Sequence, residues 1–166
     1  MKVETPCQTC RGSGVVRRPR QVKVRIPPGV ADGQRIRLKG RGGAGHNGGP
    51  PGDLYVIVHV DKHPLFGRKG RNLTLTVPIT YPEATLGATV TVPTLHDPVT
   101  LRIPPGTRSG RTFRVKGHGV SSDGAIGDLL VSVEVAVPQR LSDAEREAVE
   151  ALAAASPESP RRHLGV

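Results

Sequence analysis

Apolar and polar residues alternate along most of this chain. Segments 22–26 and 56–60 place valine or isoleucine at every second position. A period of two residues is typical of a strand that buries one of its faces. The same alternation predicts further strands at 36–39, 73–77, 88–92, 112–115 and 129–137. Because Pro27-Pro28-Gly29 cannot continue a ladder, the first of these strands must end there in a turn.

The chain contains an internal repeat. Residues 24–42 match 101–119 with ten identities in nineteen aligned positions, and the Gly-Asp-Leu of 52–54 recurs at 127–129. These matches predict two copies of one β unit, over 15–70 and 71–140. The second copy also has an opening block, 71–100, with two strands and a helical turn that ends at Gly87. Either the first unit differs by design, or its opening strands lie upstream.

A helix is predicted over 141–156, followed by a loose tail over 157–166. Ser142 and Glu145 have the spacing of a capping box. The apolar residues recur at helical spacing and form one narrow face: Leu141, Ala148, Val149, Leu152 and Ala155. A helix of about 14 residues is marginally stable alone. Its apolar face therefore packs either on its own domain or on a second copy of the chain.

The composition and charge of the chain limit the classes of protein to which it can belong. The 166 residues carry a net charge of +10, and residues 1–71 hold 15 Lys and Arg against four Asp and Glu. This basic part admits a polyanionic partner, although only four aromatic residues are available to stack on bases. No apolar run is long enough to span a membrane, and the start of the chain is not a secretory signal. Two cysteines favour a cytoplasmic location.

The two cysteines form a possible metal-binding motif. Cys7 and Cys10 lie in the pattern CxxCxGxG, whose spacing lets both thiolates reach one zinc ion. A structural zinc site takes four ligands, so this pair supplies half of one. His59 and His63 have ligand spacing but lie far from the cysteines in sequence, and we do not expect them to complete the site. The alternative is that the cysteines have no metal-binding role.

We find no catalytic constellation and predict that the chain is not an enzyme. Asp53 and Asp128 occupy equivalent Gly-Asp-Leu positions, which indicates a structural turn in each repeat. The glycine cluster after Gly40 lacks the Gly-Lys-Ser/Thr and the following helix of a phosphate-binding loop.

Taken together, the motifs resemble the C-terminal region of the DnaJ co-chaperone family. They are CxxCxGxG, IPPG, the run 33–42, Gly-Asp-Leu and His63-Pro64-Leu65-Phe66-Gly67, followed by the second IPPG and Gly-Asp-Leu. The resemblance covers about residues 7–155. It implies two tandem, similar β-sandwich-like domains and a short C-terminal helix that forms a homodimer. Residues 1–14 resemble the fourth of four CxxCxGxG copies that bind two zinc ions in the family, whose partner is the first copy.

The resemblance also implies a function. Family members hold unfolded polypeptides in an apolar groove of the first β-domain and act with a DnaK-type chaperone. By position, the groove residues here are Val22 and Val56, with Val24 and Val58 beside them; alternatively, these valines belong to an ordinary core. The chain looks like a family member cut within its zinc region, without the J domain needed to stimulate a DnaK-type ATPase. A basic, zinc-knuckle-like nucleic-acid-binding module is the alternative function.

Overall fold

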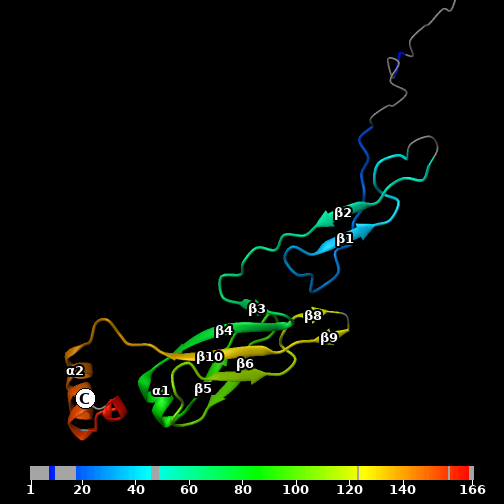
Figure 1. Cartoon of the computed structure of the whole chain (residues 1–166). Helices are drawn as coiled ribbons and strands as arrows, with labels where there is room; N and C mark the ends of the chain where they lie inside the picture. The colour runs from blue at the N-terminus through cyan, green and yellow to red at the C-terminus, as the bar shows by residue number, and fades with distance from the viewer. Residues whose placement is uncertain (1–7, 10–17, 46–48, 123, 157, 165–166) are drawn as a thin grey trace, which may run out of the picture. The chain divides into compact units, whose positions relative to one another are not determined.

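The computed structural model describes residues 8–9, 18–45, 49–122, 124–156 and 158–164. The chain divides into two compact units, the first ending at Lys62 and the second beginning at His63. Strands predominate, and the longest helix lies near the C-terminus (Figure 1). The predicted fold class, mostly β with a short C-terminal helix, is therefore confirmed. In the part of the chain described, no helix is long and apolar enough to cross a membrane.

In its described residues, the first unit contains one antiparallel strand pair. Strand β1 (Arg35–Leu38) pairs with β2 (Leu54–Ile57), with Arg35 opposite Ile57 and Leu38 opposite Leu54. Half-buried and exposed residues alternate along both strands, so one face of the pair is apolar. None of the described residues from 18 to 62 is fully buried. This unit therefore has an apolar face but no closed core among those residues.

A bulge begins the first strand pair. Gly33 has φ +74° and donates its N–H to the carbonyl of Val58 at 2.8 Å. Val58 in turn donates to the carbonyl of Gln34 at 2.9 Å. Two residues of one strand thus face one residue of the other, which is a G1 bulge and requires the left-handed conformation that glycine adopts readily. The bulge sets the register of β1 on β2.

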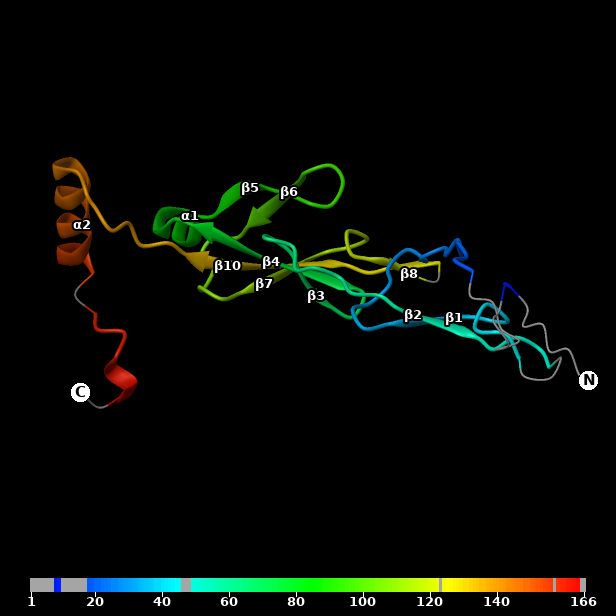
Figure 2. The ribbon, with the colours of Figure 1, turned by 90° about the horizontal axis from the view of Figure 1, so that it is seen from above.

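The second unit is built on a four-stranded mixed sheet. The sheet contains β3 (Gly67–Lys69), β4 (Asn72–Ile79), β10 (Leu129–Val135) and β7 (Thr112–Val115), in that spatial order. Strands β4 and β10 run parallel along their full length, and the two outer pairings are antiparallel. Figures 1 and 2 show β4 and β10 at the centre of this unit.

A hairpin covers one face of this sheet. Strands β5 (Ala88–Val92) and β6 (Val99–Ile103) pair only with each other, in antiparallel register. Their apolar side chains pack against β4 and β10, and the core contains Leu73, Leu75, Ile79, Ala84, Val92, Ile103, Leu129, Val131 and Val133. The second unit is consequently a small two-layer β structure. A short hairpin precedes β10. Its two strands, β8 (Ser121–Ser122) and β9 (Ala125–Ile126), have two residues each.

Both predicted helices form, and both begin with a capping box. Helix α1 (Tyr81–Leu86) is capped by Thr80 and Glu83, and it ends at Gly87 with φ +84°. Helix α2 (Asp143–Ala155) is capped by Ser142 and Glu145, as predicted, and none of its residues is buried. A short 3₁₀ turn follows at Arg162–Leu164. A capping box is a local pattern, which is why the one at Ser142 could be predicted from the sequence.

One predicted strand is wrong, and others differ at their ends. Residues 22–26 form no strand, although they align in the repeat with β6. The hydrogen bonds of β6 come from β5, and no counterpart of β5 is found in the described residues of the first unit. The strand predicted at 56–60 is Leu54–Ile57, because the bulge partner Val58 ends the regular ladder. The strand predicted at 129–137 ends at Val135.

Candidate functional site

The two repeats are stabilised by the same set of polar contacts. In the first, Asp53 accepts the Arg37 Nε–H at 2.7 Å with one carboxylate oxygen and the Gly40 N–H at 2.8 Å with the other. The Gly40 N–H and the Arg37 guanidinium hold the pKa of Asp53 below its ordinary value. These contacts tie the end of β1 to the start of β2. Asp53 is thus a structural residue, as the sequence predicts.

The second repeat shows the same arrangement. Asp128 lies 2.6 Å from Arg114 Nε and accepts the Gly117 N–H at 2.9 Å. The Gly117 N–H, and to a smaller extent Arg114, lower the pKa of Asp128, although partial burial opposes them. The bulge recurs as well, because Gly110 donates to the carbonyl of Val133 at 2.7 Å. Strands β1 and β2 are therefore the structural counterparts of β7 and β10.

This correspondence shows how differently equivalent apolar residues are covered. Leu129, Val131 and Val133 of β10 have no exposed surface. Their counterparts Leu54, Val56 and Val58 are only half-buried. We call the half-buried residues of this side, Ile36, Leu38, Leu54, Val56 and Val58, the uncovered face. Residues equivalent to those that the second unit encloses in its core are therefore partly exposed to solvent in the first unit.

The valines predicted to bind polypeptides lie in two environments. Val56 is part of β2, and Val58 is the bulge partner directly after it. Val22 and Val24 are half-buried in a segment without strand pairing. The nearby Ile26 is 55% exposed, whereas its counterpart Ile103 is 1% exposed in the core. Val56 and Val58 thus belong to the uncovered face, and the binding role of all four valines stays a prediction.

The outer edge of β2, on the side away from β1, adjoins the uncovered face. In an antiparallel ladder, alternate residues direct their backbone groups toward the neighbouring strand. Val58 bonds toward β1, so Val56 and Leu54 do likewise, and Tyr55 and Ile57 direct their N–H and C=O groups toward the opposite edge. Of the described residues, none forms a strand on that edge. This orientation follows from the register of β1 on β2. The alternation of apolar and polar residues in the sequence does not reveal it.

The metal-ligand predictions lie largely beyond what the structure describes. Cys7 and Cys10 lie outside the described residues. Within the described ranges, no group of three or more His, Cys, Asp or Glu side chains could hold a metal ion. His63 Nδ1 accepts the N–H groups of Leu65 and Phe66 at 3.1 and 3.2 Å, so it stabilises a turn. His59 lies 3.7 Å from Asp32.

A groove lies beside the C-terminal helix. It has a volume of about 410 Å³ and is lined by Tyr81 and Pro82 of α1, by Pro138, and by Leu141, Val149 and Leu152 of the helix segment. Val149 and Leu152 are 52% and 42% exposed, although they belong to the apolar face predicted from the sequence. Packing within its own unit therefore leaves much of this helix face accessible to solvent.

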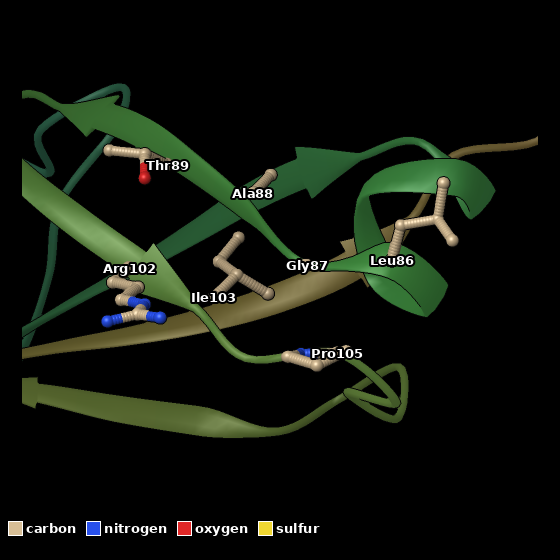
Figure 3. Close-up of a pocket in the computed structure, with 7 residues that line it drawn as sticks. All are labelled: Leu86, Gly87, Ala88, Thr89, Arg102, Ile103 and Pro105. Carbon is tan, nitrogen blue, oxygen red and sulfur yellow. The ribbon is translucent and has the colours of Figure 1, made fainter.

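A smaller pocket of about 240 Å³ lies where α1 ends (Figure 3). Gly87 and Pro105 border it, and Arg102 is its only charged lining residue. A Cβ atom on Gly87 would lie 3.0 Å from the carbonyl oxygen of Ile103, so glycine permits the chain to pass close to β6. We attribute this pocket to the packing of α1 against β6, because its lining offers no acid–base or metal-binding group.

Comparisons with known proteins agree with the sequence motifs. The model of the DnaJ C terminal domain matches residues 2–138. Chaperone protein DnaJ 1 of Streptomyces avermitilis is 58% identical over 164 residues, which are 97% of this chain and 41% of that protein. Chaperone protein DnaJ 2 of Nocardia farcinica is 56% identical, over 89% of this chain and 39% of its own length. The chain thus spans about two-fifths of the length of these relatives, which are named as chaperone proteins.

Proposed function

Because the chain belongs to the DnaJ C-terminal domain family, we propose that it binds extended segments of unfolded polypeptides through its first unit. The observation that carries the proposal is the uncovered face. Leu54 and Val56 are half-buried, whereas their counterparts Leu129 and Val131 are enclosed. An apolar client side chain that packs on this face removes apolar area from water, which is worth about 25 cal/mol per Å².

The backbone of the first unit supports the same function. An extended client next to β2 can bond with the N–H and C=O groups of Tyr55 and Ile57, which face away from β1. Main-chain bonds give affinity without a strict sequence requirement, and the neighbouring apolar face adds a preference for apolar side chains. This combination suits a chaperone, whose clients share exposed apolar segments rather than one sequence.

The family and the C-terminal helix support two further partners. We propose homodimerisation through α2, because Val149 and Leu152 are exposed on its apolar face. Cooperation with a DnaK-type chaperone rests on the family alone. We also retain, as a proposal, zinc bound by Cys7 and Cys10 with ligands from elsewhere.

Nucleic-acid binding is the competing function. Arg35 and Arg37 lie on the exposed side of β1, and Arg35 stacks over Tyr55 with 4.8 Å to the ring centroid. Arg37, however, is already paired with Asp53. Binding to phosphates must weaken steeply with salt because it releases counterions. Apolar client binding has no such requirement, so a salt series separates the two functions.

The test is to titrate the full chain into a labelled, permanently unfolded protein and, separately, into labelled RNA. We expect saturable binding of the unfolded protein that persists at high salt. Val56→Ser should weaken it about fivefold by removing apolar surface from the uncovered face. Ile57→Ser is the matched control, because Ile57 is adjacent in sequence but lies on the opposite, exposed face. Tight RNA binding without binding of the unfolded protein would contradict the proposal.

A further inference from the structure

We propose that the groove between α1 and α2 binds the tail of a second copy of the chain, residues 157–164, in an extended conformation. Each copy has one groove and one tail, so a reciprocal exchange of tails closes a symmetric dimer. This tail exchange rests on the homodimer proposed above, and it identifies the segment that fills the groove. It does not depend on client binding by the first unit.

The groove combines apolar side chains with a single carboxylate. Its volume is about 410 Å³, and Glu145 is the only charged residue that lines it. Tyr81, at the start of α1, is 52% exposed, so its ring is accessible to a ligand. Pro82 and Pro138 also line the groove. Aromatic-lined grooves bind proline-rich segments in the polyproline II conformation, so this lining suits a proline-rich ligand.

The electrostatics of the groove favour a cationic ligand. Glu145 accepts the Ser142 N–H at 2.7 Å and the Ser142 hydroxyl at 2.8 Å. The backbone N–H, and then the hydroxyl, hold the pKa of Glu145 below its ordinary value, so this carboxylate is ionised at neutral pH. Helix α2 carries four acidic residues and one arginine, with no basic residue in its last turn. A segment with positive charge is therefore complementary to this helix.

The tail has the complementary composition. Its residues 157–162 read Pro-Glu-Ser-Pro-Arg-Arg. Prolines three residues apart favour polyproline II, whose three-residue turn places both rings on one side. Pro160 and Arg161 are exposed, and Leu164 is 61% exposed. None of the described tail residues lines the groove of its own copy. The tail thus presents apolar and basic side chains that are accessible to a second copy.

The dimensions of groove and tail match only between copies. At 1.5 Å per residue, Glu145 and Leu152 lie about 10 Å apart along α2. At 3.1 Å per residue, a polyproline II tail separates Pro157 from Arg161 by about 12 Å. With Pro157 beside Leu152, Arg161 therefore lies beside Glu145. In the same copy, this placement requires the chain to reverse directly after Ser156, whereas a turn takes about four residues.

Substitutions in the tail test the ligand. Sedimentation equilibrium of the full chain measures the dissociation constant of the dimer. Pro160→Ala together with Arg161→Ala should raise this constant at least about tenfold, because the change removes a preformed backbone and the cation. Ser159→Ala is the matched control, because this residue lies on another side of a polyproline II segment than the two prolines. The control should leave the constant unchanged.

Substitutions in α1 test the groove. Tyr81→Ala should raise the dissociation constant of the dimer about tenfold, because it removes the aromatic ring that contacts the tail. Leu86→Ala is the matched control, since Leu86 is 79% exposed on the same helix but borders the smaller pocket instead of the groove. Unchanged amide signals of β10 in both variants would show that the second unit remains folded.

A mixture of the two defective chains tests whether the contact forms between copies. A heterodimer of the Tyr81→Ala chain and the chain with Pro160→Ala and Arg161→Ala pairs one intact groove with one intact tail. Each homodimer of these variants has no such pair. We expect the heterodimer to form at least about tenfold more tightly than either homodimer. A mixture that is no more dimeric than its components would overturn the tail exchange.

Two further outcomes separate the tail exchange from the homodimer on which it rests. Tail and groove variants may be compared with the double variant Val149→Asp and Leu152→Asp, which alters the apolar face of α2. If only that double variant is monomeric and the others dimerise like the parent chain, the tail exchange is wrong and the homodimer stands. A parent chain that is monomeric at high concentration would reject both.

Discussion

A terminal guanidinium nitrogen of Arg37 lies 2.6 Å from a carboxylate oxygen of Asp53, and this ion pair has a counterpart in Arg114 and Asp128. Both aspartates also accept a glycine N–H one strand away. The same turn is thus built twice, once in a unit with a closed core and once in a unit whose apolar face is only partly covered. The second unit, which has a closed core, can therefore be compared directly with the first unit, whose apolar face is only partly covered.

The first prediction concerns acid sensitivity. Hydrogen bonds from Gly40 and Gly117 and the paired arginines lower the pKa of Asp53 and Asp128. A carboxylate with a lowered folded pKa stabilises the fold above its unfolded value of about 3.9, and the contribution is lost as pH falls through the folded pKa. Carboxyl NMR titration should therefore give both midpoints below about 3.9. Midpoints at or above that value would show that the contacts do not persist in solution.

The second prediction compares equivalent core positions. Val131→Ala removes two methyl groups from a fully buried site and should lower the free energy of unfolding of the second unit by about 2 kcal/mol. Val56→Ala, at the half-buried counterpart, should lower it by less than about 1 kcal/mol. Urea unfolding followed through the amide signals of β10 and β2 measures both. Equal losses would mean that the first unit has a closed core.

The third prediction concerns the helix face. Val149→Asp together with Leu152→Asp should convert dimers to monomers, because both exposed side chains would become charged within the proposed contact. Ala154→Asp is the control, since helical geometry places this residue away from the groove lined by Val149 and Leu152. Sedimentation velocity measures the masses. A parent chain that is already monomeric at high concentration would show that α2 does not dimerise.

The fourth prediction concerns zinc. Cys7 and Cys10 provide two of the four ligands that a structural site needs. The chain should therefore bind zinc weakly, or only when cysteine pairs from two chains combine. Metal analysis after dialysis, with Cys10→Ser as the control, measures the bound ion. One zinc held tightly per monomer, at a concentration where the chain is monomeric, would refute this prediction.

Features that depend on nearby residues could be predicted from the sequence. The capping box predicted at Ser142 uses residues three apart, and it forms. Thr80 and Glu83 form the same motif, although only the helical turn that follows was predicted. The repeat was visible because its turns need particular residue types, such as the aspartate of Gly-Asp-Leu and the glycine at the bulge. These positions tolerate few alternatives, so the two copies remain recognisably similar.

Features that depend on a partner distant in the sequence could not be predicted from the sequence. Residues 22–26 alternate like a strand, but a strand forms only when another strand supplies its hydrogen bonds. The candidate valines were assigned from the family resemblance, yet the half-burial of Val56 on β2 became visible only in the structure. The outer edge of β2 depends on the register that the bulge at Gly33 sets, and alternation alone does not contain that information.

The most direct test of the proposed client binding is hydrogen exchange on the full chain, with and without an unfolded client. In the free chain, we predict strong protection in Leu129–Val135 and weak protection in residues 22–26, because only the former lies between two paired strands in a closed core. Addition of the client should slow exchange in Leu54–Ile57 while leaving Leu129–Val135 unchanged. Slowed exchange confined to the second unit, with none in β2, would contradict the proposal that the first unit binds the client.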